Sequence, residues 1–362
     1  MDHPAAVGAM GGTRAGGSVV HASAGPSGGV VVDAEACERV AALLAERLIP
    51  KPQEEIGPPG LGPLETGNFY LLLVSICHQT SPRGQAPLEG RIDDVHYRGW
   101  DYLSAKLATA ARQSASFLQP DMWARLTARD LQLLFRDDEL GDRLSDRAGR
   151  ARLVRDLGRR MLANRWKWFE DLYNASDRRI SGRRGLLSLL KEFKAYRDPI
   201  NKKSYLLLGL MQYAGFWTYA DEQEMGPPVD YHEIRGHLRI GTVSVLDADL
   251  RDKLLRQIPV TEADDLAIRG AVRDAIVSIA RMLGGAVTPM VLHYLFWNVL
   301  RSCCTHVSPH CQACPDNCPL PSRYVPLAIH ESGPRRCPFS PVCASANLIS
   351  RLQEHVFDTD YY

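Results

Sequence analysis

Seven of the nine cysteines lie within 41 residues near the C-terminus, and this density constrains the fold of that region more than any other feature. Its densest stretch reads CCTHVSPHCQACPDNCPLP. Thiolates separated by turn-forming residues can converge on one centre, and soft sulfur ligands select zinc or an iron–sulfur cluster. A disulfide framework is the alternative, but such frameworks are typical of short secreted chains. We therefore expect a metal-bound, cysteine-rich loop over residues 303–345.

The spacing of the cysteines predicts the ligands of this loop. Six residues separate the first two, two separate the next pair and three the last, in the series Cys304, Cys311, Cys314 and Cys318. Cys337 or Cys343 could replace Cys318 as the fourth ligand, whereas Cys303 points away from its neighbour on the preceding helix and is expected to pack. Four thiolates can close a structural zinc site or hold a 4Fe–4S cluster.

Length and composition indicate an ordinary globular chain. Its 362 residues are 45% hydrophobic and 23% charged, which is enough to bury a sizeable core. No apolar run has the length of a membrane span, and the N-terminus lacks a basic start followed by an apolar core. We expect a cytoplasmic monomer that does not contact a membrane.

Positive charge is concentrated in one region. Residues 143–203 contain 18 lysines and arginines against 7 acidic residues, although the net charge of the whole chain is only +1. Mixed charge usually marks a solvated helix face. An excess of this size favours a phosphate-bearing partner.

Helical periodicity dominates the chain between the ends. We expect a disordered Gly/Ala-rich tail over residues 1–33, a helical core over 34–302, the cysteine loop, and a C-terminal tail over 346–362. Thr261 is placed to cap a long helix, and LEGRIDDVHYRG reads as a loop. Strand-like alternation is nearly absent, so the predicted class is all-α.

Several motifs follow one another in an order that resembles a known superfamily. They are FYLLLVSICHQTSP, PINKKSYLLLGLMQYAGFW, PPVDYHEIRGHLRIGTV and the cysteine loop after an apolar helix. The series is similar to that of the helix-hairpin-helix DNA glycosylases with an endonuclease III-type iron–sulfur loop. It most resembles the archaeal 8-oxoguanine DNA glycosylases and the queuosine nucleotide N-glycosidases. The resemblance implies two helical subdomains flanking a catalytic cleft. The family's last cysteine spacing is five residues rather than three, and its glycine-rich, phosphate-binding hairpin is not visible before Asp230.

Two residue types in these motifs suit the cleavage of an N-glycosidic bond. A carboxylate stabilises the oxocarbenium character that develops on the sugar, and the resemblance implies that Asp230 has this role. A lysine with a lowered pKa can attack the sugar and form a Schiff base. The resemblance implies Lys203, with Lys202 as its competitor. The alternatives are an ordinary helix-capping aspartate and surface lysines.

The same comparison suggests residues that would contact nucleic acid. Gln79 lies in a turn that enters the duplex in relatives, and the alternative is a polar helix end. The other candidates are aromatic or polar neighbours of the proposed catalytic segments, namely Trp217, Tyr231, His232 and Arg235. Aromatic residues at helical spacing are more often part of a core.

These features together predict a DNA N-glycosylase that excises a modified base, with lysine-dependent lyase activity if Lys203 is buried. Repair, or defence against modified phage DNA, is the expected setting. The metal loop would position the protein without redox chemistry. A rival is a queuosine-type N-glycosidase acting on a small molecule. A third possibility is a non-catalytic nucleic-acid-binding protein with a structural metal site.

Overall fold

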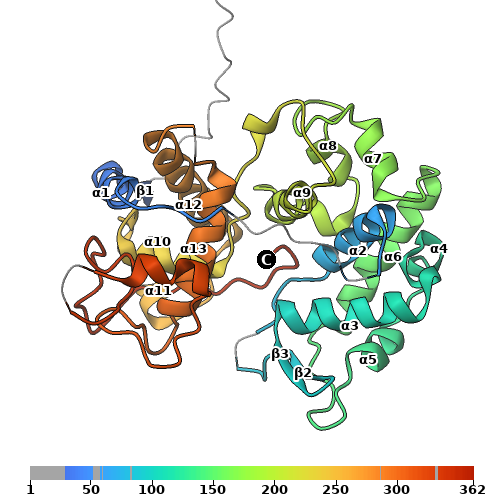
Figure 1. Cartoon of the computed structure of the whole chain (residues 1–362), viewed down its shortest axis with the longest axis horizontal. Coiled ribbons are helices and arrows are strands. Elements are labelled where there is room, and N and C mark those ends of the chain that lie inside the picture. The colour runs from blue at the N-terminus through green and yellow to red at the C-terminus, as the bar shows by residue number, and fades with distance from the viewer. Residues whose placement is uncertain (1–28, 52–57, 59, 82–83, 286, 331–332) are drawn as a thin grey trace, which may run out of the picture.

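The computed structural model describes residues 29–51, 58, 60–81, 84–285, 287–330 and 333–362, and most of them are helical (Figure 1). Within these ranges the chain forms thirteen α-helices, four 3-10 helices and two small two-stranded sheets. The predicted all-α class is therefore right at this level. None of the helices in the same ranges combines the length and the apolar character needed to span a membrane.

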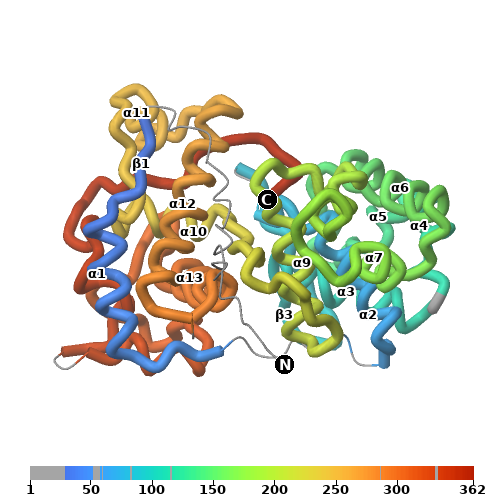
Figure 2. The backbone as a smooth tube through the Cα atoms, turned by 90° about the horizontal axis from the view of Figure 1, so that it is seen from above, coloured from blue at the N-terminus to red at the C-terminus, as the bar shows by residue number. Residues whose placement is uncertain are grey.

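The helices pack into two lobes, each with its own apolar core (Figures 1 and 2). The first lobe is built around α2 (Pro63–Ser75), which is buried from Thr66 to Ser75. Helix α2 can be apolar all round because α3, α6, α7 and α9 surround it. The other elements of this lobe are β2 (Glu89–Ile92), β3 (Val95–Arg98), α3 (Trp100–Gln113), η1 (Ala115–Leu118), α4 (Pro120–Trp123), α5 (Ala128–Phe135), α6 (Arg147–Ala163), α7 (Phe169–Ala175), α8 (Leu186–Leu190), η2 (Lys194–Tyr196), α9 (Lys202–Tyr213) and η3 (Glu222–Glu224).

The second lobe is built around α12 (Glu262–Met282), which contacts α1, α10 and α13. Thr261 caps α12 in a capping box with Asp264, and this confirms the predicted cap. The other elements are β1 (Val30–Val32), α1 (Ala34–Ala45), α10 (Tyr231–Ile240), β4 (Val243–Val245), α11 (Ala248–Arg256), α13 (Pro289–Cys303) and η4 (Ser322–Ala328). The cysteine loop follows α13 directly, as its sequence position requires.

The predicted disordered tail ends earlier than residue 33. Val30–Val32 form β1 and pair antiparallel with β4, so that Val31 lies opposite Ser244. Three consecutive β-branched residues favour an extended backbone, and β4 supplies its hydrogen bonds. Residues 1–28 of the predicted tail lie outside the described residues.

The segment LEGRIDDVHYRG is a β-hairpin rather than the expected loop. Ile92 pairs with Val95, and the turn residues Asp93 and Asp94 have φ angles of 48° and 62°. Positive φ at both positions is typical of the tight turns that join hairpin strands, and aspartate tolerates it.

A buried ion pair joins the two lobes. Arg269 on α12 donates to both carboxylate oxygens of Asp198, at 3.1 and 2.6 Å. Asp198 also accepts the backbone N–H of Lys202 at 2.7 Å, in the first turn of α9. Both charged side chains are fully buried and depend on each other, since neither can be solvated alone. The start of α9 is thereby tied to the second lobe.

The predicted C-terminal tail is packed between the lobes. We call residues 353–362 the C-terminal strap, and the C-terminus lies between the lobes in both views (Figures 1 and 2). Tyr362 donates to Asp265 of the second lobe at 2.5 Å. Asp358 and Asp360 approach the first lobe, where they contact the turn that follows α2. The strap therefore bridges the two lobes.

Candidate functional site

Both candidate lysines begin α9, and both are buried. Asn201 precedes them with a φ of 61°, so the chain turns sharply into the helix. The Nζ atom of Lys203 donates to the carbonyl of Ser75 at 2.7 Å and lies 3.3 Å from Nδ1 of His78. Burial is the main cause that lowers the pKa of Lys203 to about 7, and the charge of Lys202 adds to it. An amine with such a pKa is partly unprotonated near neutral pH, as a nucleophile must be.

Lys202 has different neighbours from Lys203. Its Nζ atom lies 3.9 Å from the sulfur of Cys77. Burial raises the pKa values of Asp230 and Glu233, and the charge of Lys202 opposes this effect, so Lys202 lies within electrostatic range of both carboxylates. Lys203 thus packs against the end of α2, while Lys202 neighbours the start of α10.

Asp230 caps α10, which agrees with the alternative interpretation of its sequence position as a helix-capping aspartate. One carboxylate oxygen accepts the backbone N–H groups of His232 and Glu233, at 2.8 and 3.2 Å. Burial raises the pKa of Asp230, and the charge of Glu233 adds to this effect. A carboxylate so enclosed interacts strongly with any positive charge that develops beside it.

Glu233 and His293 form a second buried contact beneath Asp230. The carboxylate of Glu233 accepts the backbone N–H of Asp230 at 3.1 Å and so completes the capping box. Its Oε1 atom lies 3.0 Å from Nδ1 of His293. Burial raises the pKa of Glu233 well above its usual value and lowers the pKa of His293 to about 3. Each shift favours the uncharged form of its own group.

The other polar candidates on α10 are already engaged. Tyr231 and His232 are half-buried, with ring centroids 4.1 Å apart. Arg235 forms an ion pair with Glu354 of the strap at 2.8 Å and donates to the carbonyl of Cys304 at 2.7 Å. Its Nη2 atom also lies 2.8 Å from Nδ1 of His232. The guanidinium predicted to contact nucleic acid is therefore held by the strap and the cysteine loop.

Gln79 and Trp217 occupy very different environments. Gln79 lies in the turn after α2 with a φ of 43°, and its amide donates to Asp358 of the strap at 3.3 Å. Trp217 was expected at the base-binding site, but it lies in the core of the first lobe and is 2% exposed. Its ring stacks on Tyr173 and packs against Phe169, at centroid distances of 4.2 and 4.4 Å. These apolar neighbours enclose the ring and leave no face for a base.

The cysteines of the loop are free thiols. Burial raises the pKa of Cys343 to about 12, and charge on three further cysteines adds to it, namely Cys337, Cys304 and Cys311. Burial also raises the pKa of Cys314 to about 11, and its next cause is the charge of Cys318. Charge on Cys337 also raises the pKa of Cys314, so Cys337 lies within electrostatic range of both ends of the predicted ligand series. Cys337 and Cys343 lie within electrostatic range of Cys304 and Cys311.

Arg239, near the end of α10, forms hydrogen bonds with the cysteine loop. Its Nη1 atom donates to the sulfur of Cys304 at 3.4 Å, and the thiol of Cys343 donates to its carbonyl at 3.2 Å. In the described ranges no three cysteine sulfurs lie within 4.8 Å of one another, whereas thiolates on one tetrahedral zinc lie about 3.8 Å apart. The cysteines in these ranges therefore do not form an arrangement typical of a metal centre, and the Arg239 guanidinium lies beside the sulfur of Cys304.

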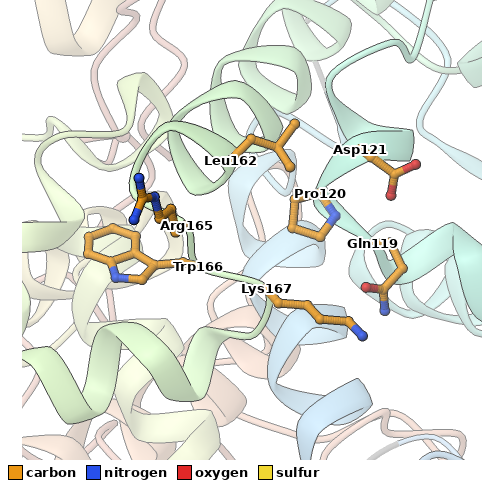
Figure 3. Close-up of a pocket in the computed structure, with 7 residues that line it drawn as sticks. All are labelled: Gln119, Pro120, Asp121, Leu162, Arg165, Trp166 and Lys167. Atoms are coloured by element: carbon orange, nitrogen blue, oxygen red, sulfur yellow. The ribbon is translucent and has the colours of Figure 1, made fainter.

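A shallow pocket of about 290 Å³ lies where the end of α6 meets the start of α4 (Figure 3). Its lining residues are Gln119, Pro120, Asp121, Leu162, Arg165, Trp166 and Lys167. The pocket includes no residue of α9 or α10, so it is separate from the lysines and Asp230.

The basic region is largely exposed on the first lobe. Only three carboxylates between residues 143 and 203 are exposed, against eleven basic side chains. The exposed basic residues are Arg152, Arg159, Arg165, Lys167, Arg178, Arg179, Arg183, Arg184, Lys191, Lys194 and Arg197. This surface can attract a polyanion.

Sequence reasoning missed several residues of the site. Asp230 and Glu233 are three residues apart, which is the spacing of a capping box. The sequence could therefore have identified Glu233 as part of the helix start. His78 and His293 lie far apart in the chain, and no local pattern marks either of them.

Comparison of the chain with protein-family models finds no match, and comparison with curated proteins finds none either.

Proposed function

We propose that this chain is an N-glycosylase that releases a modified base from DNA, with a fold of the helix-hairpin-helix glycosylase type. One observation carries the proposal. The buried carboxylate of Asp230 on α10 lies within electrostatic range of the buried amine of Lys202 on α9, and the buried amine of Lys203 is the next residue on the same helix. Such a set can stabilise a sugar cation and then capture it.

In this proposal Asp230 stabilises the oxocarbenium character of the transition state. Its position at the start of α10 holds the carboxylate in place through two backbone N–H groups, so little reorganisation is needed when charge develops. Burial strengthens the interaction because water cannot screen it.

A buried lysine would supply the lyase activity. Lys203 has the lowered pKa that a nucleophilic amine needs, while Lys202 is within electrostatic range of Asp230. Attack of the amine nitrogen on the sugar C1′ expels the base, which leaves with a proton, and the resulting imine can be reduced by borohydride. If neither lysine attacks, water is the nucleophile and the enzyme only releases the base.

The exposed basic surface on the first lobe supports a DNA substrate, because its charge matches a phosphate backbone. We assign a structural role to the cysteine loop. Cys304 and Cys311 would hold a 4Fe–4S cluster together with either Cys314 and Cys318 or Cys337 and Cys343, and zinc is the alternative metal. The cluster would fix the loop beside α10 and take no part in bond cleavage.

The strap favours a second candidate function. It contacts both lobes beside the lysines, and Asp358 and Asp360 add negative charge there. A free modified nucleoside or nucleotide could reach such an enclosed site more readily than a duplex, as a queuosine-type N-glycosidase would require. A duplex needs the strap to move.

Released base is the direct test of both candidates. The protein would be incubated with duplexes carrying modified bases and, separately, with the matching free nucleosides. We expect Asp230→Asn to reduce base release by at least about 100-fold, since one lost electrostatic group costs that much in other enzymes. Asp247→Asn is the matched control because Asp247 caps α11 outside the site.

The outcomes separate the classes of function. Release from duplexes supports the DNA enzyme, and release from nucleosides alone supports the small-molecule enzyme. DNA binding without release from any substrate would leave the non-catalytic alternative. Full activity of Asp230→Asn would refute the catalytic assignment. Borohydride trapping with Lys202→Met and Lys203→Met tells the two lysines apart.

A further inference from the structure

A second group of ligand-type side chains lies between the first lobe and the C-terminal strap. His78 comes from the turn after α2, Asp146 from the N-cap of α6 and Asp360 from the strap. One ligand atom of each residue lies within 4.8 Å of the other two. Three segments that are distant in sequence thus bring one imidazole and two carboxylates together.

The imidazole of His78 has an unused ligand atom. The residue is 2% exposed, and its buried Nε2 atom has no hydrogen-bond partner. This atom lies 3.6 Å from Oδ1 of Asp360, which is too long for a hydrogen bond. Two ligand atoms that share a tetrahedral ion at bond lengths of about 2.1 Å lie about 3.4 Å apart. The observed separation therefore suits two ligands of one ion.

The two carboxylates are free to act as ligands. Asp146 accepts the backbone N–H of Gly149 with one oxygen, which leaves the other available. Among the described residues, neither Asp146 nor Asp360 forms a salt bridge with a lysine or arginine. Arg150 lies within electrostatic range of both, but its guanidinium donates to the carbonyl of His78 and other backbone oxygens.

We propose that His78, Asp146 and Asp360 bind a divalent first-row transition ion and that this ion latches the strap to the first lobe. One imidazole nitrogen and two carboxylate oxygens suit Mn²⁺ or Zn²⁺, and three protein ligands leave a position for water or an anionic group. Repulsion from Arg150 and the two lysines of α9 weakens binding, so we expect micromolar rather than nanomolar affinity.

Binding of Mn²⁺ alone is the first test, because this ion avoids the thiolates of the cysteine loop. Loss of the free Mn²⁺ signal in electron paramagnetic resonance would be measured on the full chain. We expect one ion per wild-type chain and affinity at least about tenfold lower in Asp360→Asn and Asp146→Asn. Asn also caps helices, so Asp146→Asn keeps α6 intact. Asp358→Asn, two residues from Asp360 on the same strap, should bind like the wild type.

Hydrogen exchange of the strap is the second test. Mn²⁺ should slow exchange over residues 353–362 in the wild type and in Asp358→Asn, but not in Asp360→Asn. Absence of Mn²⁺ and Zn²⁺ binding at millimolar concentration would refute the site, as would wild-type affinity in Asp360→Asn. Binding without slower exchange would refute the latch. None of these readouts depends on glycosylase activity.

Discussion

Replacement of Gly236 by alanine tests how α10 is positioned. Gly236 lies in the middle of this helix, which begins at Asp230 and ends beside the cysteine loop. A Cβ atom at this position would lie 2.6 and 2.8 Å from Cδ2 and Cγ of Leu300 on α13. Leu300 is buried, so its side chain has little room to move away. The absence of a side chain at Gly236 therefore permits the close approach of the two helices.

The expected magnitude follows from two opposing effects. Alanine is favoured over glycine in a helix by about 1 kcal/mol, whereas an extra methyl group in a packed core costs about 1–3 kcal/mol. Gly270→Ala is the matched control, since a Cβ atom there on α12 would meet nothing within 4 Å. The helix preference is common to both variants. The difference in their free energies of unfolding therefore measures the overlap, and we expect Gly236→Ala to be the less stable by about 1–3 kcal/mol.

Urea unfolding followed by circular dichroism gives both free energies. We expect Gly270→Ala to be more stable than the wild type and Gly236→Ala to be less stable than Gly270→Ala. Combining Gly236→Ala with Leu300→Ala should cost less than the sum of the single changes, because the smaller residue makes room for the methyl group. Equal stability of the two glycine variants, or strict additivity of the double variant, would refute this account of the helix contact.

Three further predictions concern charge, pH and the cysteine loop. Arg269→Met removes the ion-pair partner of two buried carboxylates, Asp198 and Asp265, and should destabilise by about 3–5 kcal/mol in urea unfolding, while Arg281→Met, exposed on the same helix, should be nearly neutral. Burial lowers the pKa of His237 to about 3, but the unfolded chain binds this proton below about pH 6.5. Stability should therefore fall between pH 6.5 and 3, and His237→Gln should reduce the slope by about 1.4 kcal/mol per pH unit. Anaerobically purified protein should contain iron and sulfide, and Cys343→Ser should lose more of both than Cys318→Ser. Equal iron content in the two variants would refute the proposal that Cys343 is a cluster ligand. Stoichiometric zinc without iron would refute the proposal of an iron–sulfur cluster.

The parts of the fold that depend on short-range patterns were predictable. Helical periodicity and caps such as Thr261 and Asp230 depend on residues within one or two turns, so the sequence is sufficient to place them. The hairpin over residues 89–98 was missed because its strands are short and its turn residues are polar.

By itself, the sequence determined the helical class, the start of a helix after Asp230 and the concentration of thiols near the C-terminus. Only the tertiary structure decided that Trp217 belongs to a core, that Cys343 neighbours Cys304, and that the strap reaches His78. These relations join residues that are distant in the chain. They arise from the packing of whole helices, for which local periodicity carries no information.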